Sequence, residues 1–156
     1  MSKFHGKFES ARQDWETPHS LFNVINREFQ FTLDAAASAK NTKVKHYINK
    51  KQNGLLRSWG QNVVWLNPPY GQGTAPISAW VRKAYHESLS GATTVLLIPA
   101  RTNTNWFHDF CLKRGEVRFI RGRPKFGGAK QGLPQPLCFV IFRAKDLGIL
   151  QQENEL

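Results

Sequence analysis

The order of apolar and polar residues along the chain predicts a domain in which helices and strands alternate. Apolar residues recur at helical spacing between residues 21 and 29, which indicates an amphipathic helix with Thr17 as its N-cap and Pro18 at its first position. Residues 29–34 alternate between apolar and polar side chains, as in a half-buried strand that ends at Asp34. The chain is therefore expected to open with a helix followed by a strand.

The middle of the chain continues this alternation. A polar stretch over residues 40–53 precedes a short helix signal at 55–59, and the apolar run 63–66 then predicts a strand. Helical spacing behind Pro76, up to residue 89, predicts a second long helix. The continuous apolar run 95–98, ended by a proline, is typical of a buried parallel strand.

The last third predicts one more helix and two strands. Residues 106–112 share helical spacing, and Gly115 is expected to end that helix. Residues 117–120 and 137–142 are expected to be antiparallel neighbours, joined by the Gly- and Pro-rich loop 122–136. The elements together indicate the α/β class with three layers.

Length and composition favour one compact domain. With 156 residues, of which 40% are hydrophobic and 12% aromatic, the chain can bury a substantial core. We expect a single domain over residues 1–150 and a disordered polar tail over 151–156. No apolar stretch approaches the roughly 20 residues that span a bilayer, and the first residues lack a signal-peptide core. A cytoplasmic protein without a membrane partner is expected.

Two common kinds of site receive no support from the sequence. Cys111 and Cys138 are the only cysteines, lie in apolar surroundings and lack C-x-x-C spacing, so buried structural thiols are expected rather than a disulfide or a metal site. The chain contains no G-x-G-x-x-G, so a nicotinamide or flavin site is not indicated. No metal is expected.

The charge of the chain indicates a polyanionic partner. Lys and Arg number 22 against 11 Asp and Glu, which gives a formal charge of +11, and no acid occurs between Asp34 and Glu87. Such a field attracts phosphate backbones without regard to base sequence. On charge alone, a merely well-solvated basic surface remains an equal alternative.

The tetrapeptide Asn67-Pro68-Pro69-Tyr70, directly behind the apolar run 63–66, predicts a reaction. The exocyclic amine of adenine is a poor nucleophile, and two acceptors aimed at its hydrogens, the Asn67 side-chain oxygen and the Pro68 carbonyl, would localise its lone pair. The two prolines would hold both acceptors in place before the substrate arrives. Tyr70 offers a face on which a planar base can stack. The tetrapeptide predicts an amine methyltransferase loop; a plain proline turn is the alternative.

A methyl donor is expected at the turn that follows the strand 29–34. Ligands of open α/β sheets bind at the carboxyl ends of the strands. Asp34 could hold an ammonium group, and Ser38 or the adjacent backbone amides could hold a carboxylate. Three small side chains would let the backbone approach a ligand closely: Ala35, Ala36 and Ala37. The alternative is an aspartate that caps a turn above packed alanines.

Several segments carry a resemblance to a known family. In chain order they are Asp14-Trp15-Glu16-Thr17-Pro18, Leu33-Asp34-Ala35-Ala36-Ala37-Ser38, Asn53-Gly54-Leu55 with Trp59, Asn67-Pro68-Pro69-Tyr70, Leu97-Ile98-Pro99-Ala100-Arg101-Thr102 with Trp106-Phe107, Phe119-Ile120-Arg121-Gly122-Arg123-Pro124-Lys125-Phe126, and the closing strand around 137–142. Together they resemble the phage-type DNA N6-adenine methyltransferase (Dam) family over most of the chain. The tetrapeptide by itself also occurs in methyltransferases of protein glutamine or RNA.

The resemblance implies a Rossmann-like methyltransferase fold, S-adenosylmethionine as methyl donor and transfer to N6 of adenine in DNA. It implies that residues 34–38 form the amino-acid pocket of the donor and that residues 67–70 form the catalytic loop. The segment that closes over the donor would contain Trp15, Thr17 and Pro18.

One feature departs from the usual pattern of methyltransferases. These enzymes generally hold the ribose hydroxyls of the donor with a carboxylate after the second strand, and this chain has no acid from residue 35 to residue 86. Asn53 or Asn49 would then substitute as a neutral partner, or Glu16 would supply an acid from elsewhere.

DNA is the expected partner. An adenine in a duplex must leave the base stack to reach a catalytic loop. Four cations are candidates for phosphate or base-edge contacts, with solvent-facing charges as the alternative for each one: Arg101, Arg121, Arg123 and Lys125. The loop 127–136 is the best candidate in the sequence for an element that recognises DNA.

Two other functions stay open from the sequence. One is methylation of a protein-glutamine or RNA amine, and the other is a basic DNA-binding protein that has lost catalysis. The sequence context of methylation and the oligomeric state are not determined, with a monomer as the simpler expectation. If the protein is encoded by a phage or prophage, the cytoplasm is that of the host cell.

Overall fold

The computed structural model describes residues 16–69, 74–126 and 135–145. The described helices are α1 (His19–Phe29), α2 (Ile77–Leu89) and η1 (Phe107–Leu112), of which η1 is a π-helical stretch inside a longer helix. The described strands are β1 (Leu33–Asp34), β2 (Val63–Leu66), β3 (Thr93–Pro99), β4 (Glu116–Phe119) and β5 (Leu137–Phe142). The predicted tail 151–156 and much of the loop 122–136 lie outside the described residues.

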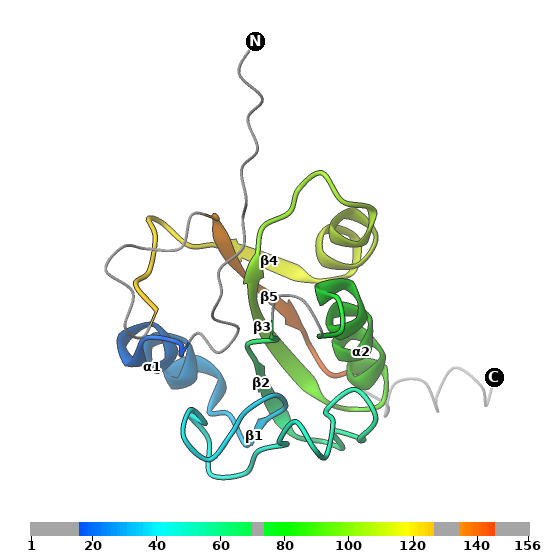
Figure 1. The fold of residues 1–156 in the computed structure, drawn as a ribbon. Coiled ribbons are helices and arrows are strands. Elements are labelled where there is room, and N and C mark those ends of the chain that lie inside the picture. The colour runs from blue at the N-terminus through cyan, green and yellow to red at the C-terminus, as the bar shows by residue number, and fades with distance from the viewer. Residues whose placement is uncertain (1–15, 70–73, 127–134, 146–156) are drawn as a thin grey trace, which may run out of the picture.

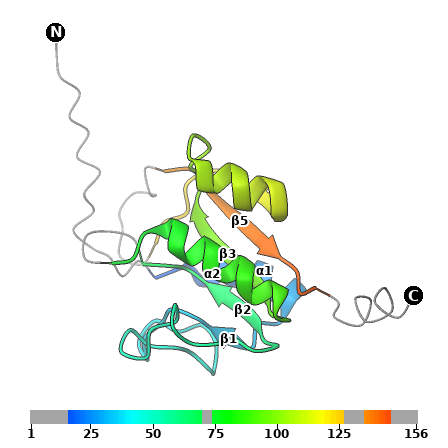
Figure 2. The ribbon, with the colours of Figure 1, turned by 90° about the vertical axis from the view of Figure 1, so that its right-hand side faces the viewer.

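The five strands form one mixed sheet in the order β1-β2-β3-β5-β4. Strands β1, β2 and β3 are parallel, whereas β5 runs antiparallel to both of its neighbours, β3 and β4. α1 lies against one face of the sheet, and α2 and η1 lie against the other (Figures 1 and 2). The α/β class and the antiparallel pairing of the last two strands are confirmed.

A hydrophobic core fills the space on each face of the sheet because successive side chains of a strand point to opposite sides. On the α1 side, Phe22 packs edge-on against Trp65, with ring centroids 5.2 Å apart and an interplanar angle of 82°. On the other side, Trp80 and Ala84 of α2 pack against Leu66 and its neighbours. Aromatic packing of the Phe22 type adds about 0.5–1.5 kcal/mol to the burial itself.

The start of α1 differs from the prediction. Pro18, not Thr17, is the N-cap: its ψ of 134° is extended, and its carbonyl accepts the amide of Phe22 at 3.1 Å. The Thr17 side chain makes no capping hydrogen bond, because its hydroxyl is turned toward the loop after β2. The prediction of Thr17 as N-cap was wrong.

The predicted strand 29–34 is shorter than expected. α1 continues to Phe29, and Gln30 ends it in the left-handed conformation with a φ of 54°. The amide of Phe31 then bonds to the Asn26 side chain, so only Leu33 and Asp34 remain as a strand. Phe29 fits both the 3.6-residue period of a helix and the two-residue period of a strand, and in the structure it belongs to the helix.

Residues 35–62 contain neither helix nor strand, only turns and one bridge between Asp34 and Tyr47. The predicted helix at 55–59 was wrong: the amide of Leu55 bonds to the Asn53 side chain, and five residues are too few to stabilise a helix without strong support. The chain thus goes from β1 to β2 without an intervening strand. The extra strand after which a ribose-binding acid usually follows is therefore absent between β1 and β2.

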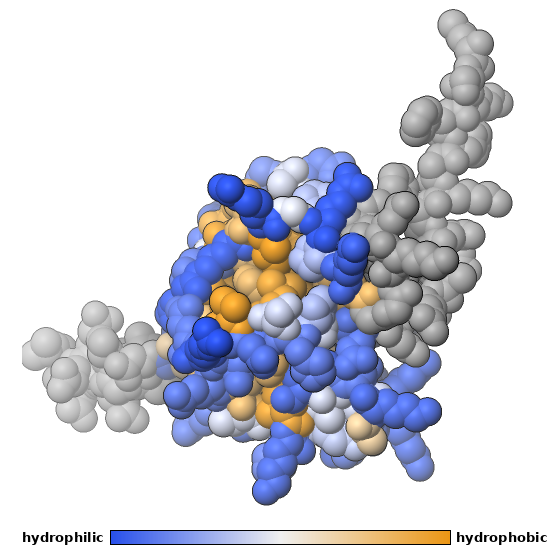
Figure 3. All heavy atoms as spheres, turned by 90° about the vertical axis from the view of Figure 1, so that its left-hand side faces the viewer, coloured by the Kyte–Doolittle hydropathy of each residue, from blue (hydrophilic) through white to orange (hydrophobic). Residues whose placement is uncertain are grey.

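Within the described ranges, no helix is long and apolar enough to cross a membrane. Seen from the α1 side, the surface is mostly hydrophilic, with apolar residues in separate patches (Figure 3).

Candidate functional site

A hollow with a volume of about 670 Å³ lies where β1 and β2 end. Ten of the residues predicted for the site line it: Thr17, Asp34, Ala35, Ala36, Ala37, Ser38, Asn53, Asn67, Pro68 and Pro69. A smaller hollow of about 390 Å³, next to Tyr85, contains none of them. The predicted donor turn and catalytic loop therefore share one cavity.

Among the described residues, one residue predicted for the donor site or the catalytic loop is not brought to this cavity. Pro18 is not among its lining residues, because it forms the N-terminus of α1. Trp15 and Tyr70 lie outside the described residues.

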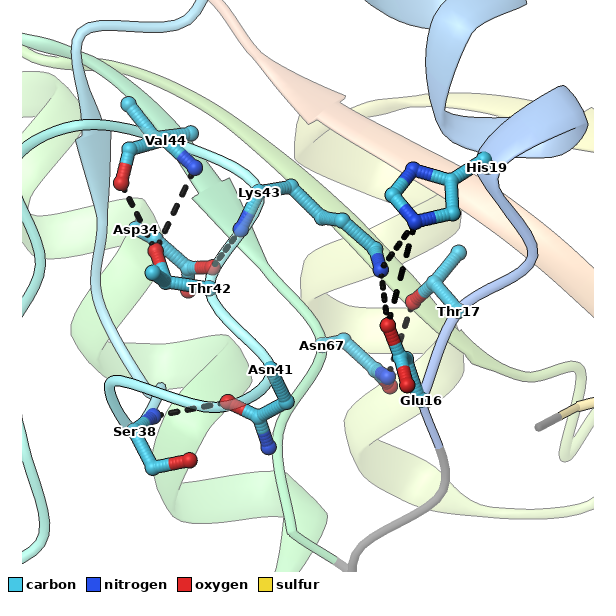
Figure 4. Close-up of polar contacts among 10 residues, drawn as sticks. All are labelled: Glu16, Thr17, His19, Asp34, Ser38, Asn41, Thr42, Lys43, Val44 and Asn67. Carbon is cyan, nitrogen blue, oxygen red and sulfur yellow. Dashed lines mark hydrogen bonds and ion pairs between the residues drawn. The ribbon is translucent and has the colours of Figure 1, made fainter.

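The loop after β2 is tied to the segment that precedes α1. Pro68 is buried, and Asn67 and Pro69 are half-buried. Asn67 donates a hydrogen bond from Nδ2 to Oγ1 of Thr17 at 3.1 Å, across 50 positions of sequence (Figure 4). The side chain of Asn67 is thus oriented by the segment that precedes α1.

Asp34, the last residue of β1, is a buried carboxylate at the wall of the cavity. It is 3% exposed, and burial raises its pKa from 3.8 to about 6. Hydrogen bonds from the amides of Ala36, at 3.3 Å, and Lys43, at 3.5 Å, act in the opposite direction but are too long to prevail. Asp34 therefore caps its turn, which was the alternative interpretation of the sequence. Its ionised carboxylate also lies buried beside the cavity, where desolvation makes the charge unfavourable for folding.

The backbone amides after Asp34 are not available to a ligand, contrary to the expectation. Those of Ala35, Ala36 and Ala37 donate to Trp65 O, Asp34 Oδ1 and Ile48 O. The amide of Ser38 donates to Asn41 Oδ1 at 2.7 Å. Each amide has one hydrogen, so a carboxylate at this wall would have to bind side chains instead. Two such side chains line the cavity: Ser38, as predicted, and Lys40, which sequence reasoning had not assigned to the site.

A tight turn forms the opposite wall. Asn49 and Gln52 exchange hydrogen bonds between side chain and backbone, both at 2.9 Å, and Asn53 adopts a left-handed φ of 59°. The side-chain oxygens of Asn49 and Asn53 each accept a backbone amide of this turn. Both asparagines line the cavity with their geometry already set.

Gly54 is a site residue that sequence reasoning named only as part of a motif. A Cβ at this position would lie 2.2 Å from the carbonyl oxygen of Ala35 and 3.1 Å from the Trp80 ring. The two walls of the cavity therefore approach each other so closely that only glycine fits.

We expect Gly54→Ala to destabilise the fold by about 1–3 kcal/mol, the usual cost of overpacking, and to distort the cavity. Urea unfolding measures the first effect and ligand titration the second. Leu56→Ala, two positions on at a side chain 80% exposed, is the matched control and should change neither. Wild-type stability in Gly54→Ala would contradict the close approach.

A charged cluster at the cavity mouth was also missed. Lys43 Nζ lies 2.5 Å from Glu16 Oε1 and 3.5 Å from His19 Nε2 (Figure 4). The Lys43 side chain is only 4% exposed, and its hydrogen bond and charge lower the pKa of Glu16. Glu16 and Lys43 both line the cavity, and no periodicity of the sequence could have paired them.

Trp80 contributes the one buried side-chain polar atom of the described residues that lacks a hydrogen-bond partner, its indole Nε1. An unpaired buried donor costs about 1–3 kcal/mol. Because Trp80 also lines the cavity, this wall is not optimised for stability alone.

The predicted DNA-contacting cations lie at the same edge of the sheet. β3 and β4 each run antiparallel to β5, so Arg101 after β3 and the segment 121–125 after β4 leave the sheet at the edge where β1 and β2 also end. The side chains of Arg101, Arg121, Arg123 and Lys125 are all exposed. By contrast, Arg118 is bound by Glu28 and Glu116.

Phe119 stands directly before this basic segment and is 66% exposed. An exposed aromatic ring beside cations is a common element of nucleic-acid surfaces. From the sequence, Phe119 was named only as part of a strand and of the resembling segment, without a role in DNA binding.

The cysteines are structural. Cys111 and Cys138 are free and buried, and burial raises the pKa of each thiol to about 12. Among the described residues, no group of three His, Cys, Asp or Glu side chains is placed to bind a metal.

An α/β sheet whose parallel strands end at one cavity, with an Asn-Pro-Pro loop on one side and a buried carboxylate on the other, has the layout of a small-molecule-binding enzyme domain. The sequence model of the DNA N-6-adenine-methyltransferase (Dam) family matches residues 6–143. The chain belongs to this family.

Two phage proteins are similar to the chain, and both are named DNA N-6-adenine-methyltransferase. The protein of Haemophilus phage HP1 (strain HP1c1) is 33% identical over 123 residues, which cover 77% of this chain and 68% of that protein. The protein of Escherichia phage T1 is 31% identical over 114 residues, which cover 72% of this chain but only 46% of that protein. The chain therefore spans about half the length of the second relative.

Proposed function

We propose that this protein has a Rossmann-like methyltransferase fold and transfers a methyl group from S-adenosylmethionine to N6 of adenine in DNA. The observation that carries the proposal is that the Asn67-Pro68-Pro69 loop and the Asp34 turn line one cavity, in a chain of the Dam family. A monomer stays the simpler expectation for the oligomeric state of the protein. We expect the protein to act in the cytoplasm, where its DNA substrate lies.

The cavity fits the proposed donor in size and in chemistry. Its volume falls within the roughly 300–1,000 Å³ of small-molecule sites. One wall holds the Asp34 carboxylate, suited to the donor's ammonium group, with the Ser38 hydroxyl and Lys40 nearby for its carboxylate. Ile48, Leu55 and Trp80 offer apolar surface for its adenine ring. When bound, the donor supplies an electrophilic methyl group.

The ribose contact is assigned to the turn that contains Asn49 and Asn53. The absence of a strand between β1 and β2 removes the usual place for an acid, and Glu16 is engaged by Lys43. The oxygens of Asn49 and Asn53 already accept backbone amides, so their side-chain NH₂ groups are the donors that would face ribose oxygens.

The loop after β2 would act on the target amine. Asn67 Oδ1 and the Pro68 carbonyl accept the two amino hydrogens, which localises the nitrogen lone pair and stabilises the positive charge that develops there. The adenine must be flipped out of the duplex, and Tyr70 is the proposed stacking partner, which compensates part of the unstacking cost of a few kcal/mol.

The exposed cations beside the cavity are proposed to bind the DNA backbone. We expect Arg123→Ala to weaken DNA binding and to reduce the salt slope of log K by about one unit, because one phosphate contact is lost. Lys113→Ala, an exposed cation between η1 and β4 at the opposite edge, is the control for charge alone. Equal salt slopes for wild type and Arg123→Ala would show that Arg123 contacts no phosphate and is only a solvent-facing charge.

Labelled methyl transfer separates this function from its rivals. Purified protein and labelled S-adenosylmethionine are incubated with DNA, with RNA and with a protein extract. Label in DNA alone supports the proposal, whereas label in RNA or protein selects the other amine substrates. No binding of the donor by calorimetry would favour an inactive DNA-binding protein.

A further inference from the structure

The catalytic role proposed for Asn67 depends on which end of its amide faces the substrate. A carboxamide has an acceptor, Oδ1, and a donor, Nδ2, on one flat group of nearly the same shape. Only Oδ1 can accept a hydrogen from the target amine, and a rotated amide would present its own NH₂ group. Something in the protein must select the productive orientation.

Thr17 is in contact with the end of the amide that must point away from the substrate. Asn67 Nδ2 donates to Thr17 Oγ1 at 3.1 Å, and Thr17 is 4% exposed, so water competes little for this contact. The hydroxyl accepts from Nδ2, so Oδ1 lies at the other end of the planar amide group, away from Thr17.

The position of Thr17 is itself fixed on both sides. Pro18 follows it, which biases its backbone to extended geometry, and the Pro18 carbonyl is held by the Phe22 amide at the start of α1. Glu16 precedes it and is held by Lys43 at 2.5 Å (Figure 4). The hydroxyl is therefore presented to Asn67 by a segment anchored at two points.

We propose that Thr17 is a positioning residue that orients the Asn67 amide, so that Oδ1 faces the amine of the target base. The proposal rests on the proposed function and adds to it the group that sets the polarity of the catalytic amide. It also gives Thr17 a reason to be buried here instead of capping α1.

The first test separates turnover from binding. Thr17→Val keeps the shape and removes the hydroxyl, and we expect kcat at saturating donor to fall about 10–100-fold, the order expected for a misoriented catalytic group, while DNA affinity stays close to wild type. Thr17→Ser restores the hydroxyl and should recover most of kcat. Thr17→Ala, a second variant without the hydroxyl, should behave like Thr17→Val.

Thr94→Val is the matched control. Thr94 is fully buried, and its hydroxyl bonds to the Ala84 carbonyl between β3 and α2, away from the cavity. Loss of this hydroxyl should leave kcat unchanged, which shows that a buried threonine-to-valine change does not by itself reduce turnover.

The second test needs no substrate. The side-chain amide signal of Asn67, assigned by its loss in Asn67→Asp, should show slower hydrogen exchange in wild type and Thr17→Ser than in Thr17→Val. The proposal is overturned if hydrogen exchange of the Asn67 amide is the same in Thr17→Val as in wild type. It is also overturned if wild type methylates DNA and Thr17→Val does so with the same kcat. If wild type does not methylate DNA but the exchange depends on Thr17, the proposed function fails and the orienting contact stands.

Discussion

Replacement of Asn67 by alanine should reduce methyl transfer by at least about 100-fold, the order seen when one preorganised polar group is removed from a catalytic site. The side chain is the proposed acceptor for one hydrogen of the target amine, and it lies in the cavity wall rather than among the exposed cations. DNA affinity should therefore stay close to wild type. Single-turnover transfer and a DNA titration on the same preparation measure the two effects.

Asn23→Ala is the control for Asn67→Ala, because Asn23 is exposed on α1 and lines no part of the cavity. It should leave both quantities unchanged. Transfer at the wild-type rate by Asn67→Ala would refute the catalytic assignment, and a parallel loss of DNA binding would indicate that Asn67 contacts DNA instead.

Asp34→Asn should weaken donor binding by about 100-fold, as expected when one partner of a buried charged contact is neutralised. The same change should stabilise the protein at neutral pH. Burial raises the pKa of Asp34 from 3.8 to about 6, so at pH 7 the ionised carboxylate costs up to about 3 kcal/mol of folding free energy. A loss of folding free energy of this kind is expected for a buried group that is kept for ligand binding.

The sign of the pH dependence follows from this shift. The folded protein holds the Asp34 proton up to about pH 6, whereas the unfolded chain releases it near pH 3.8. The contribution of Asp34 to stability is therefore fully present below about pH 4 and is lost as the pH rises through 6. Donor binding runs the other way, because only the carboxylate attracts an ammonium group, and it should weaken below about pH 6.

Urea unfolding and calorimetric titration, each at pH 5 and pH 7.5, measure both effects of Asp34→Asn. The gain in stability should be larger at pH 7.5 than at pH 5. Equal donor affinity of variant and wild type at pH 7.5 would assign Asp34 to its turn-capping role alone.

The parts of the site that follow strands could be predicted from the sequence. Asp34 ends one strand and Asn67 follows another, and because parallel strands end at the same edge, the sequence pattern was enough to expect both in one place. The long helix after Pro76 could be predicted from the helical spacing of its apolar residues, and the last strand from its continuous apolar run over residues 137–142.

Contacts between distant irregular segments could not be predicted in this way. The pairing of Lys43 with Glu16 and the approach of Gly54 to the Ala35 carbonyl arise in residues without any periodic pattern. The hydroxyl of Thr17 had two possible partners, the first turn of α1 and the loop after β2, and only the tertiary structure decides between them. The amides after Asp34 were assigned to a ligand because their acceptors, among them the Asn41 side chain, come from elsewhere in the fold.

Mass spectrometry of nucleosides tests most directly whether the protein methylates adenine in DNA at this cavity. DNA is incubated with the purified protein and S-adenosylmethionine, digested to nucleosides and compared with DNA treated with Asn67→Ala. N6-methyldeoxyadenosine is expected in the sample treated with wild type, with a strong reduction in the sample treated with Asn67→Ala. Methylated cytosine in place of methylated adenine, or no methylated nucleoside from a protein that binds the donor, would contradict the proposed function.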